Sequence, residues 1–232
     1  MGQGVSTMAV QFLCQETGVD PEFVEVRVET SAGATAGMTT ASRATSIIGN
    51  AIIIASKKLR QDLEQYTLTD LVGNVYSGEW VCDWTTRPGA ETDEIITHYS
   101  YSYATQVVTL DENGKIDAVY AAHDAGKIIN PTLFEGQIEG SVHMGLGYAL
   151  TEDLPLENGA PKSTRLRKCG ILRAKETPRI VVIGVEAPDP HGPHGAKGVG
   201  EIGLVPTAGA VANALYQYDG VRRYTLPMKG KQ

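Results

Sequence analysis

The amino-acid sequence predicts an α+β fold in which helices pack against mixed β-sheets. Helix-like and strand-like periodicities alternate along the 232 residues, which places helices between strands. An Asn113-Gly114 pair between two apolar, strand-like runs is typical of a β-hairpin, so some neighbouring strands must be antiparallel. Hydrophobic residues make up 42% of the chain, which is enough for a packed core. A doubly wound parallel sheet is therefore disfavoured.

The first half of the chain is predicted to hold two helices and two strands. Apolar residues at helical spacing follow the loop at 1–4 and predict a helix that ends at Gly18. Alternating apolar and charged residues predict a strand over 23–29. A longer run of apolar residues at helical spacing predicts a helix over 40–65, and a second strand is expected over 74–84.

The second half of the chain carries the hairpin and the remaining elements. In order, the patterns predict strands over 99–110 and 115–122, a helix over 131–150, a strand over 179–186, a loop over 188–200, a helix over 206–218 and a strand over 221–226. The polar loop around 154–161 suggests two lobes with a boundary near 151–162.

Composition and charge exclude several classes of protein. The net charge of −7 at pH 7, without a basic cluster, argues against a nucleic-acid-binding surface. No apolar run is long enough for a membrane span, and the N-terminus lacks the order of a signal peptide. The three cysteines are far apart and form no CxxC pair, so an iron–sulfur or cysteine-based zinc site within this chain is not expected. We expect a cytoplasmic protein.

Glycine is concentrated where a ligand with phosphates could bind. The chain has 26 glycines, and many of them fall in four regions: 1–4, 33–37, 136–147 and 192–203. Glycine lets the backbone approach a ligand closely, and successive N–H groups near helix N-termini bind anions. Tight turns and close helix packing are the alternative interpretation of each region.

The segment Thr39–Arg43 leads into the predicted helix over 40–65. Thr40 or Ser42 would serve as the N-cap of this helix. Arg43 carries a planar guanidinium group that can reach a phosphate. A salt bridge at the surface is an equally good interpretation of Arg43 from the local sequence.

The histidines do not form a recognisable catalytic or metal-binding motif. His123 and Asp124 could be half of a catalytic triad, but no G-x-S-x-G nucleophile motif accompanies them, so a structural turn is the better interpretation. His191 and His194 lie in a Pro-rich loop, and two histidines alone make a poor metal site.

Glu201 is the strongest candidate for a catalytic group. It follows several glycines and precedes the predicted helix over 206–218. A carboxylate in a Gly-rich, partly dehydrated turn can act as a general base. The alternative is that Glu201 caps the helix that follows, and the local sequence leaves both interpretations open.

Five segments, taken in order, resemble the molybdenum hydroxylases, which include the xanthine dehydrogenases and aldehyde oxidoreductases. The segments are MGQG (1–4), TTASRAT (39–45), AAHDAGKIINP (121–131), EGQIEGSVHMGLGYAL (135–150) and GPHGAKGVGEIGL (192–204). Each motif is modest by itself, but their shared order is specific. Over residues 1–232 the chain looks like the C-terminal half of the molybdopterin-binding domain in the cofactor-binding subunit.

The resemblance implies a cofactor and a set of residues that contact it. The cofactor is molybdopterin, with or without a cytosine dinucleotide extension, and its dithiolene rather than the protein holds the molybdenum. The implied cofactor-binding residues are Gly2, Gln3, Gly4, Ala41, Ser42, Arg43, Ala44, Gln137, Val199 and Gly200. The implied general base is Glu201, in an oxidative hydroxylation of an aldehyde or a purine-like N-heterocycle that takes its oxygen from water.

The resemblance also implies partners that this chain does not contain. We expect an N-terminal molybdopterin-binding half, as a segment or a subunit, together with iron–sulfur clusters, with or without FAD, on other domains or subunits. Without them the chain is expected to be inactive. The alternative is a non-catalytic fragment or a module for subunit interaction, which the start of the chain at MGQG suggests.

Overall fold

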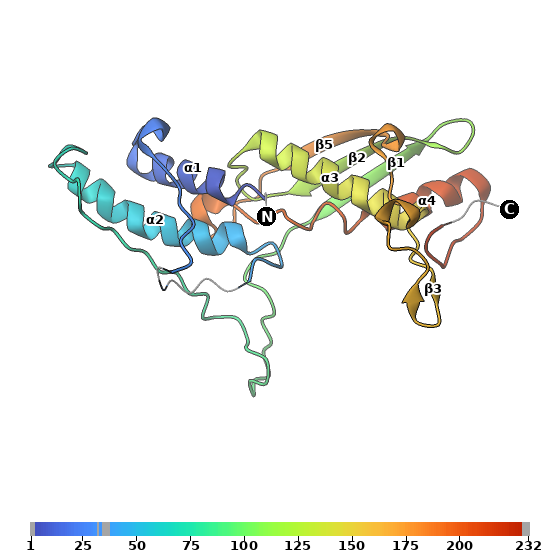
Figure 1. Cartoon of the computed structure of the whole chain (residues 1–232), viewed down its shortest axis with the longest axis horizontal. Helices are drawn as coiled ribbons and strands as arrows, with labels where there is room; N and C mark the ends of the chain where they lie inside the picture. The colour runs from blue at the N-terminus through green and yellow to red at the C-terminus, as the bar shows by residue number, and fades with distance from the viewer. Residues whose placement is uncertain (1–2, 32, 34–37, 229–232) are drawn as a thin grey trace. The chain divides into compact units, whose positions relative to one another are not determined.

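The computed structural model describes residues 3–31, 33 and 38–228, and they form two compact units (Figure 1). The units alternate along the sequence. Unit 1 comprises Met1–Tyr101, Ala125–Asn130 and Glu186–Gly198, and unit 2 comprises Ser102–Asp124, Pro131–Val185 and Val199–Gln232. The segment 151–162, where the sequence suggests a boundary between lobes, lies within unit 2.

Two helices, α1 (Val5–Thr17) and α2 (Ala44–Leu63), pack against each other in unit 1. The helix expected to end at Gly18 is confirmed: Gly18 has a left-handed φ of 75°, and its N–H bonds to Cys14 O. The two helices meet around Phe12, which is 1% exposed and packs with Ile53 and Ala196. Two short 3-10 helices, η1 (Pro21–Phe23) and η4 (Pro193–Gly195), belong to the same unit.

Unit 2 contains the mixed sheet that the sequence predicts. β1 (Ala104–Leu110) pairs antiparallel with β2 (Ile116–Asp124), which pairs parallel with β5 (Arg179–Val185). The hairpin between β1 and β2 turns at Gly114, where φ is 76°. Asp111 stabilises this turn, because its carboxylate accepts hydrogen bonds from the backbone N–H groups of Asn113 and Lys115. The α+β class is confirmed.

Two helices cover one face of this sheet: α3 (Pro131–Leu150) and α4 (Thr207–Asp219) (Figure 1). α3 has the bounds that the sequence predicts. The two helices approach closely at Gly145, where an added Cβ would lie 2.6 Å from the Thr207 side chain. The remaining elements of unit 2 are short: β3 (Leu156–Glu157), β4 (Ala160–Pro161), η2 (Leu166–Lys168) and η3 (Ala174–Glu176).

The strands expected over 23–29 and 74–84 are wrong. Residues 24–29 pair with no strand in the described part of the chain, and Val28 is 85% exposed, so this segment is not packed into a sheet. Residues 74–84 follow α2 as irregular chain: Lys58 Nζ donates to Ser77 O, and Gly78 lies directly against the α2 backbone. One side-chain hydrogen bond and close backbone packing against α2 take the place of a strand ladder here.

The strand expected over 221–226 is also wrong, because the chain turns back on the end of α4. The Asp219 carboxylate accepts a hydrogen bond from Val221 N and pairs with the Arg223 guanidinium at 2.7 Å. The Val221 N–H is therefore bonded to a side chain rather than to a neighbouring strand. None of the helices in the described part of the chain combines the length and the apolarity that crossing a bilayer requires.

Candidate active site

In unit 1, a strained turn precedes α2. Ala41 and Ser42 have φ values of 51° and 53°, a left-handed conformation that residues other than glycine rarely adopt. Arg43 closes the turn, because its backbone N–H donates to Thr40 O at 3.2 Å and its Nε donates to Met38 O at 2.7 Å. Strain of this kind persists only where the surrounding structure enforces it, and it clusters at functional sites.

The helix that follows the turn begins without a side-chain cap. The N-cap of α2 is Arg43, and among the described residues no side chain accepts a hydrogen bond from the first turn. The expectation that Thr40 or Ser42 caps this helix is wrong, because the left-handed turn places the start of the helix beyond both residues. An anionic ligand such as a phosphate could bind the N–H groups at this uncapped helix start.

Gly198 holds the other side of this turn. A Cβ added at Gly198 would lie 1.6 Å from Ser42 O, so only glycine fits between the two backbones. The neighbouring chain is fixed as well, since Lys197 N donates to Ala125 O at 2.9 Å and Lys127 N donates to Gly195 O at 2.8 Å. The Gly-rich segment before Glu201 is thus packed backbone to backbone.

The histidines of the same loop anchor it to unit 1. His191 O accepts a hydrogen bond from Asn50 Nδ2 at 2.8 Å, and the His191 ring lies 4.6 Å from Trp84. His194 Nε2 lies 3.8 Å from the buried carboxylate of Glu16. Both rings have structural contacts, so a joint role as metal ligands has no support in the geometry.

The N-terminal glycine motif is described only in part. Gly2 lies outside the described residues. Gln3 is exposed, and Gly4 has a left-handed φ of 77° at the start of α1, with its carbonyl accepting from Met8 N. Gln3, Gly4, Ala41, Ser42, Arg43 and Ala44 therefore all belong to unit 1.

In unit 2, the turn that carries Glu201 is held by α3. Gln137 Nε2 donates to Gly200 O at 2.8 Å, and Ser141 Oγ donates to Gln137 O at 2.7 Å. Val199 is half-buried, whereas the Glu201 side chain is exposed at the surface of the unit. The structure thus brings Gln137, Val199, Gly200 and Glu201 together.

Two expectations about Glu201 from the local sequence are wrong. Its carboxylate is exposed rather than partly dehydrated, because the turn 200–206 lies at the surface of unit 2. Glu201 also does not cap α4, since this helix begins only at Thr207 and its N-cap is Pro206. The turn positions the carboxylate without giving it a structural role at the helix end.

A buried polar pair lies beneath this turn, and the sequence points to only one of its members, His123. Gln106 Nε2 lies 3.1 Å from His123 Nε2 and donates to Gly203 O at 2.8 Å. His123 is fully buried at the end of β2, and this burial lowers the pKa of its imidazole. His123 and Asp124 lie in β2 rather than in the structural turn that the sequence suggests. A lone glutamine in a strand carries no signal in sequence that would single it out.

The lowered pKa of His123 predicts how stability depends on pH. Below the ordinary histidine pKa of about 6.5, the unfolded chain binds a proton at His123 that the folded chain still excludes. Stability is therefore expected to decrease as the pH falls below about 6.5 towards the lowered pKa. Urea unfolding midpoints measured between pH 7.5 and pH 5 should show this decrease.

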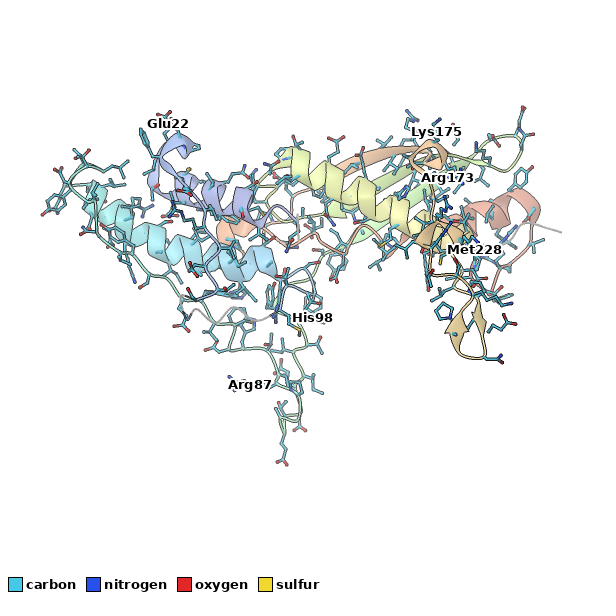
Figure 2. The ribbon with its side chains drawn as sticks, viewed as in Figure 1. Glu22, Arg87, His98, Arg173, Lys175 and Met228 are labelled. Atoms are coloured by element: carbon cyan, nitrogen blue, oxygen red, sulfur yellow. The ribbon has the colours of Figure 1, made fainter. Side chains whose placement is uncertain are left out.

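The variant His123→Gln should flatten this pH dependence, because it removes the titrating group. The matched control is His98→Gln, which changes an exposed histidine on the irregular part of unit 1 (Figure 2) and should keep the wild-type slope. An unchanged slope in His123→Gln would mean that other groups cause the acid sensitivity.

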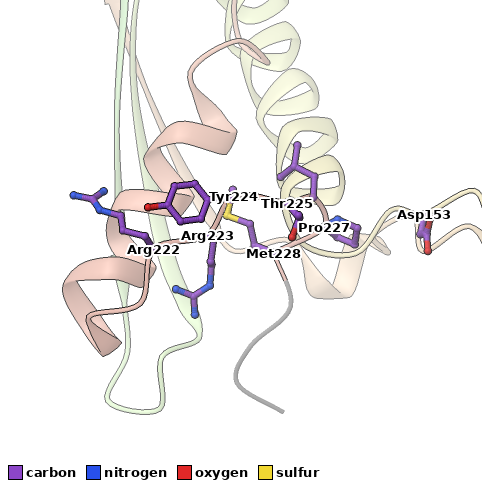
Figure 3. Close-up of a pocket in the computed structure, with 8 residues that line it drawn as sticks. Asp153, Arg222, Arg223, Tyr224, Thr225, Pro227 and Met228 are labelled. Atoms are coloured by element: carbon purple, nitrogen blue, oxygen red, sulfur yellow. The ribbon is translucent and has the colours of Figure 1, made fainter.

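A cavity of about 540 Å³ lies elsewhere in unit 2 (Figure 3). Its lining consists of Asp153, Arg222, Arg223, Tyr224, Thr225, Leu226, Pro227 and Met228. The Arg223 guanidinium pairs with Asp219, and Arg222 stacks 3.7 Å from the Tyr216 ring centroid. None of the candidate residues lines this cavity.

Comparison with known proteins identifies the family. A family model described as the molybdopterin cofactor-binding domain matches residues 1–73 and 68–178. The chain is 27% identical over 264 residues to the carbon monoxide dehydrogenase large chain of Hydrogenophaga pseudoflava, covering 97% of this chain and 33% of the relative. It is 30% identical over 226 residues to the aldehyde oxidoreductase of Megalodesulfovibrio gigas, covering 90% of this chain and 25% of the relative.

Solved structures agree with this assignment. The aldehyde oxidoreductase from Desulfovibrio gigas matches with a TM-score of 0.86 at 29% identity, over 98% of this chain and 27% of that chain. The chain therefore spans between a quarter and a third of the length of these relatives. From the family model and the fold, the chain belongs to the molybdopterin cofactor-binding domain family.

Proposed function

We propose that this chain forms part of the active site of a molybdenum hydroxylase, with Glu201 as the general base. The observation that carries the proposal is the turn in unit 2, where Gln137 fixes Gly200 O and leaves the adjacent Glu201 carboxylate exposed. An exposed carboxylate on a fixed backbone can accept a proton from a reacting group without a conformational change in the protein. We propose an aldehyde or a purine-like N-heterocycle as the substrate.

The residues of unit 1 fit an anionic pterin cofactor. The backbone approach of Gly198 to Ser42 leaves no room for a side chain, and the N-terminus of α2 has no side-chain cap. Such a turn offers backbone N–H groups and a favourable helix dipole to a phosphate. We assign Ala41, Ser42, Arg43 and Ala44 to the phosphate and pterin contacts, together with Gln3 and the adjacent glycines Gly2 and Gly4.

In this proposal the protein residues position the cofactor and take up a proton, and the cofactor would accept the electrons. Bound molybdopterin would supply the redox chemistry of the hydroxylation. Glu201 would take up the proton of the water-derived oxygen nucleophile, and Gln137 holds the backbone at Gly200 next to this carboxylate. We assign Gln137, Val199 and Gly200 to the cofactor contacts as well. The pterin dithiolene rather than a protein side chain would hold the metal.

The proposal includes partners, because this chain spans a third or less of the compared relatives. We assign the rest of the cofactor site to an N-terminal molybdopterin-binding half. Electrons would leave through iron–sulfur clusters, with or without FAD, on other domains or subunits. This chain is not assigned a cluster, because its three cysteines, Cys14, Cys82 and Cys169, are free and far apart in the sequence. A cytoplasmic location is part of the same proposal.

Anaerobic turnover tests the reaction class. The native assembly is supplied with a purine in ¹⁸O-labelled water, with a dye as electron acceptor and no oxygen gas, and an aldehyde is tested in parallel by dye reduction. We expect at least one substrate to be oxidised, and a hydroxylated purine to carry ¹⁸O from water. A strict requirement for oxygen gas, or product oxygen derived from it, would contradict the proposal.

A further inference from the structure

Beneath the Glu201 turn, unit 2 contains a buried polar chain that runs from β2 through β1 to the turn. The Gln106 amide nitrogen contacts His123 Nε2 at 3.1 Å and Gly203 O at 2.8 Å. Gln106 is 9% exposed and His123 is fully buried. An amide nitrogen can only donate, so the His123 nitrogen that faces it must be a neutral acceptor. The histidine therefore orients the amide, and the amide holds the carbonyl of Gly203.

The turn is fixed on both sides of Glu201. Gln137 holds Gly200 O from α3, and Gly203 O accepts from Gln106 and, at 3.2 Å, from Thr207 Oγ1. Gly203 also packs against α3, where an added Cβ would lie 2.5 Å from the Ser141 Cβ. Glu201 is exposed between these two held carbonyls, so its backbone position is determined by the contacts below it.

The chemistry of the pair is poorly suited to a purely structural role. Among the described residues, neither Gln106 Oε1 nor His123 Nδ1 has a hydrogen-bonding partner, although both atoms are buried. Two apolar side chains would fill the same core without leaving polar atoms unpaired. The pair supplies one thing that apolar residues cannot, which is a directed donor to Gly203 O.

We propose that Gln106, oriented by His123, is a positioning residue for the general base, and that it fixes the Glu201 carboxylate by holding Gly203 O. The proposal rests on the proposed function, because it assumes that Glu201 accepts the proton. Gln106 itself touches no reacting atom. A displacement of Glu201 by about 1 Å would reduce the rate of the chemical step roughly a hundredfold, while Gln137 would still hold Gly200 O.

The test is Gln106→Met in the native assembly, which keeps the length of the side chain and removes both amide donors. We expect kcat to fall about tenfold to a hundredfold, with KM and molybdenum content close to wild type. The matched control is Val107→Thr, which changes an exposed position on the opposite face of β1 and should keep wild-type kcat. Gln106→Leu, which also lacks any donor to Gly203 O, should show the same loss and serves if Gln106→Met fails to fold.

A double-mutant cycle separates positioning from general structural support. If Gln106 acts through Glu201, adding Gln106→Met to Glu201→Gln should reduce the residual kcat no further. Wild-type kcat in both Gln106 variants, or losses that multiply in the double variant, would overturn the inference. If Glu201→Gln alone keeps its activity, the proposed function fails instead, so the two failures are distinguishable.

Discussion

Glu201→Gln in the assembled enzyme is expected to remove nearly all turnover while the cofactor content stays normal. Glutamine keeps the size of the side chain but cannot accept the proton, and the loss of a general base lowers the rate about 10²- to 10⁴-fold. Because Glu201 is exposed and Gln137 fixes the adjacent Gly200 backbone, the substitution should leave the fold intact. Steady-state kcat and the molybdenum content of the same preparation measure the two effects.

The control for this variant is Glu112→Gln, which neutralises an exposed carboxylate in the β1–β2 turn of the same unit. This variant should match the wild type in both measurements. Activity of Glu201→Gln within about tenfold of wild type would contradict the role of a general base. A loss of activity that merely follows a loss of molybdenum would assign Glu201 to cofactor binding instead.

Gly198→Ala is expected to have the second-largest effect, through the cofactor rather than through the base. The added methyl group would overlap Ser42 O, so the turn formed by Ala41 and Ser42 must move away from the loop. Overpacking of this kind destabilises a protein by about 1–3 kcal/mol. If the turn holds the pterin phosphate, most of the bound molybdopterin should be lost as well.

Gly209→Ala is the matched control, because an added Cβ at this position in α4 meets nothing within 4 Å. Replacing glycine within a helix by alanine should keep the thermal midpoint or raise it slightly. Pterin content and thermal unfolding of both variants measure the effect. If Gly198→Ala has wild-type pterin content and midpoint, the turn before α2 is not part of the cofactor site.

The elements that the sequence predicts correctly have strong local signals. α1 ends where Gly18 can adopt a left-handed conformation, and the β1–β2 hairpin turns at Gly114. The strands that proved wrong depend on partners distant in sequence. Residues 74–84 carry a strand-like pattern, but they run along α2 without a neighbouring strand, and no local pattern reveals whether such a neighbour exists.

In the candidate site, too, features with a local sequence signal could be predicted, and features that depend on distant residues could not. The glycines and Glu201 could be recognised because they form motifs with a fixed order along the chain. The left-handed backbone of Ala41 and Ser42 could not be predicted, since neither residue favours it and packing against Gly198 accompanies it. Gln106 was missed because its role depends on Gly203, which lies 97 positions away in sequence.

Cofactor analysis of the native assembly tests the central claim most directly. The assembly would be purified through this chain together with its partner subunits, and its molybdenum would be measured by mass spectrometry and its pterin by fluorescence after oxidation. We predict molybdenum and pterin in amounts equimolar with this chain. An assembly that contains neither molybdenum nor pterin would contradict the account and would favour a non-catalytic module for subunit interaction.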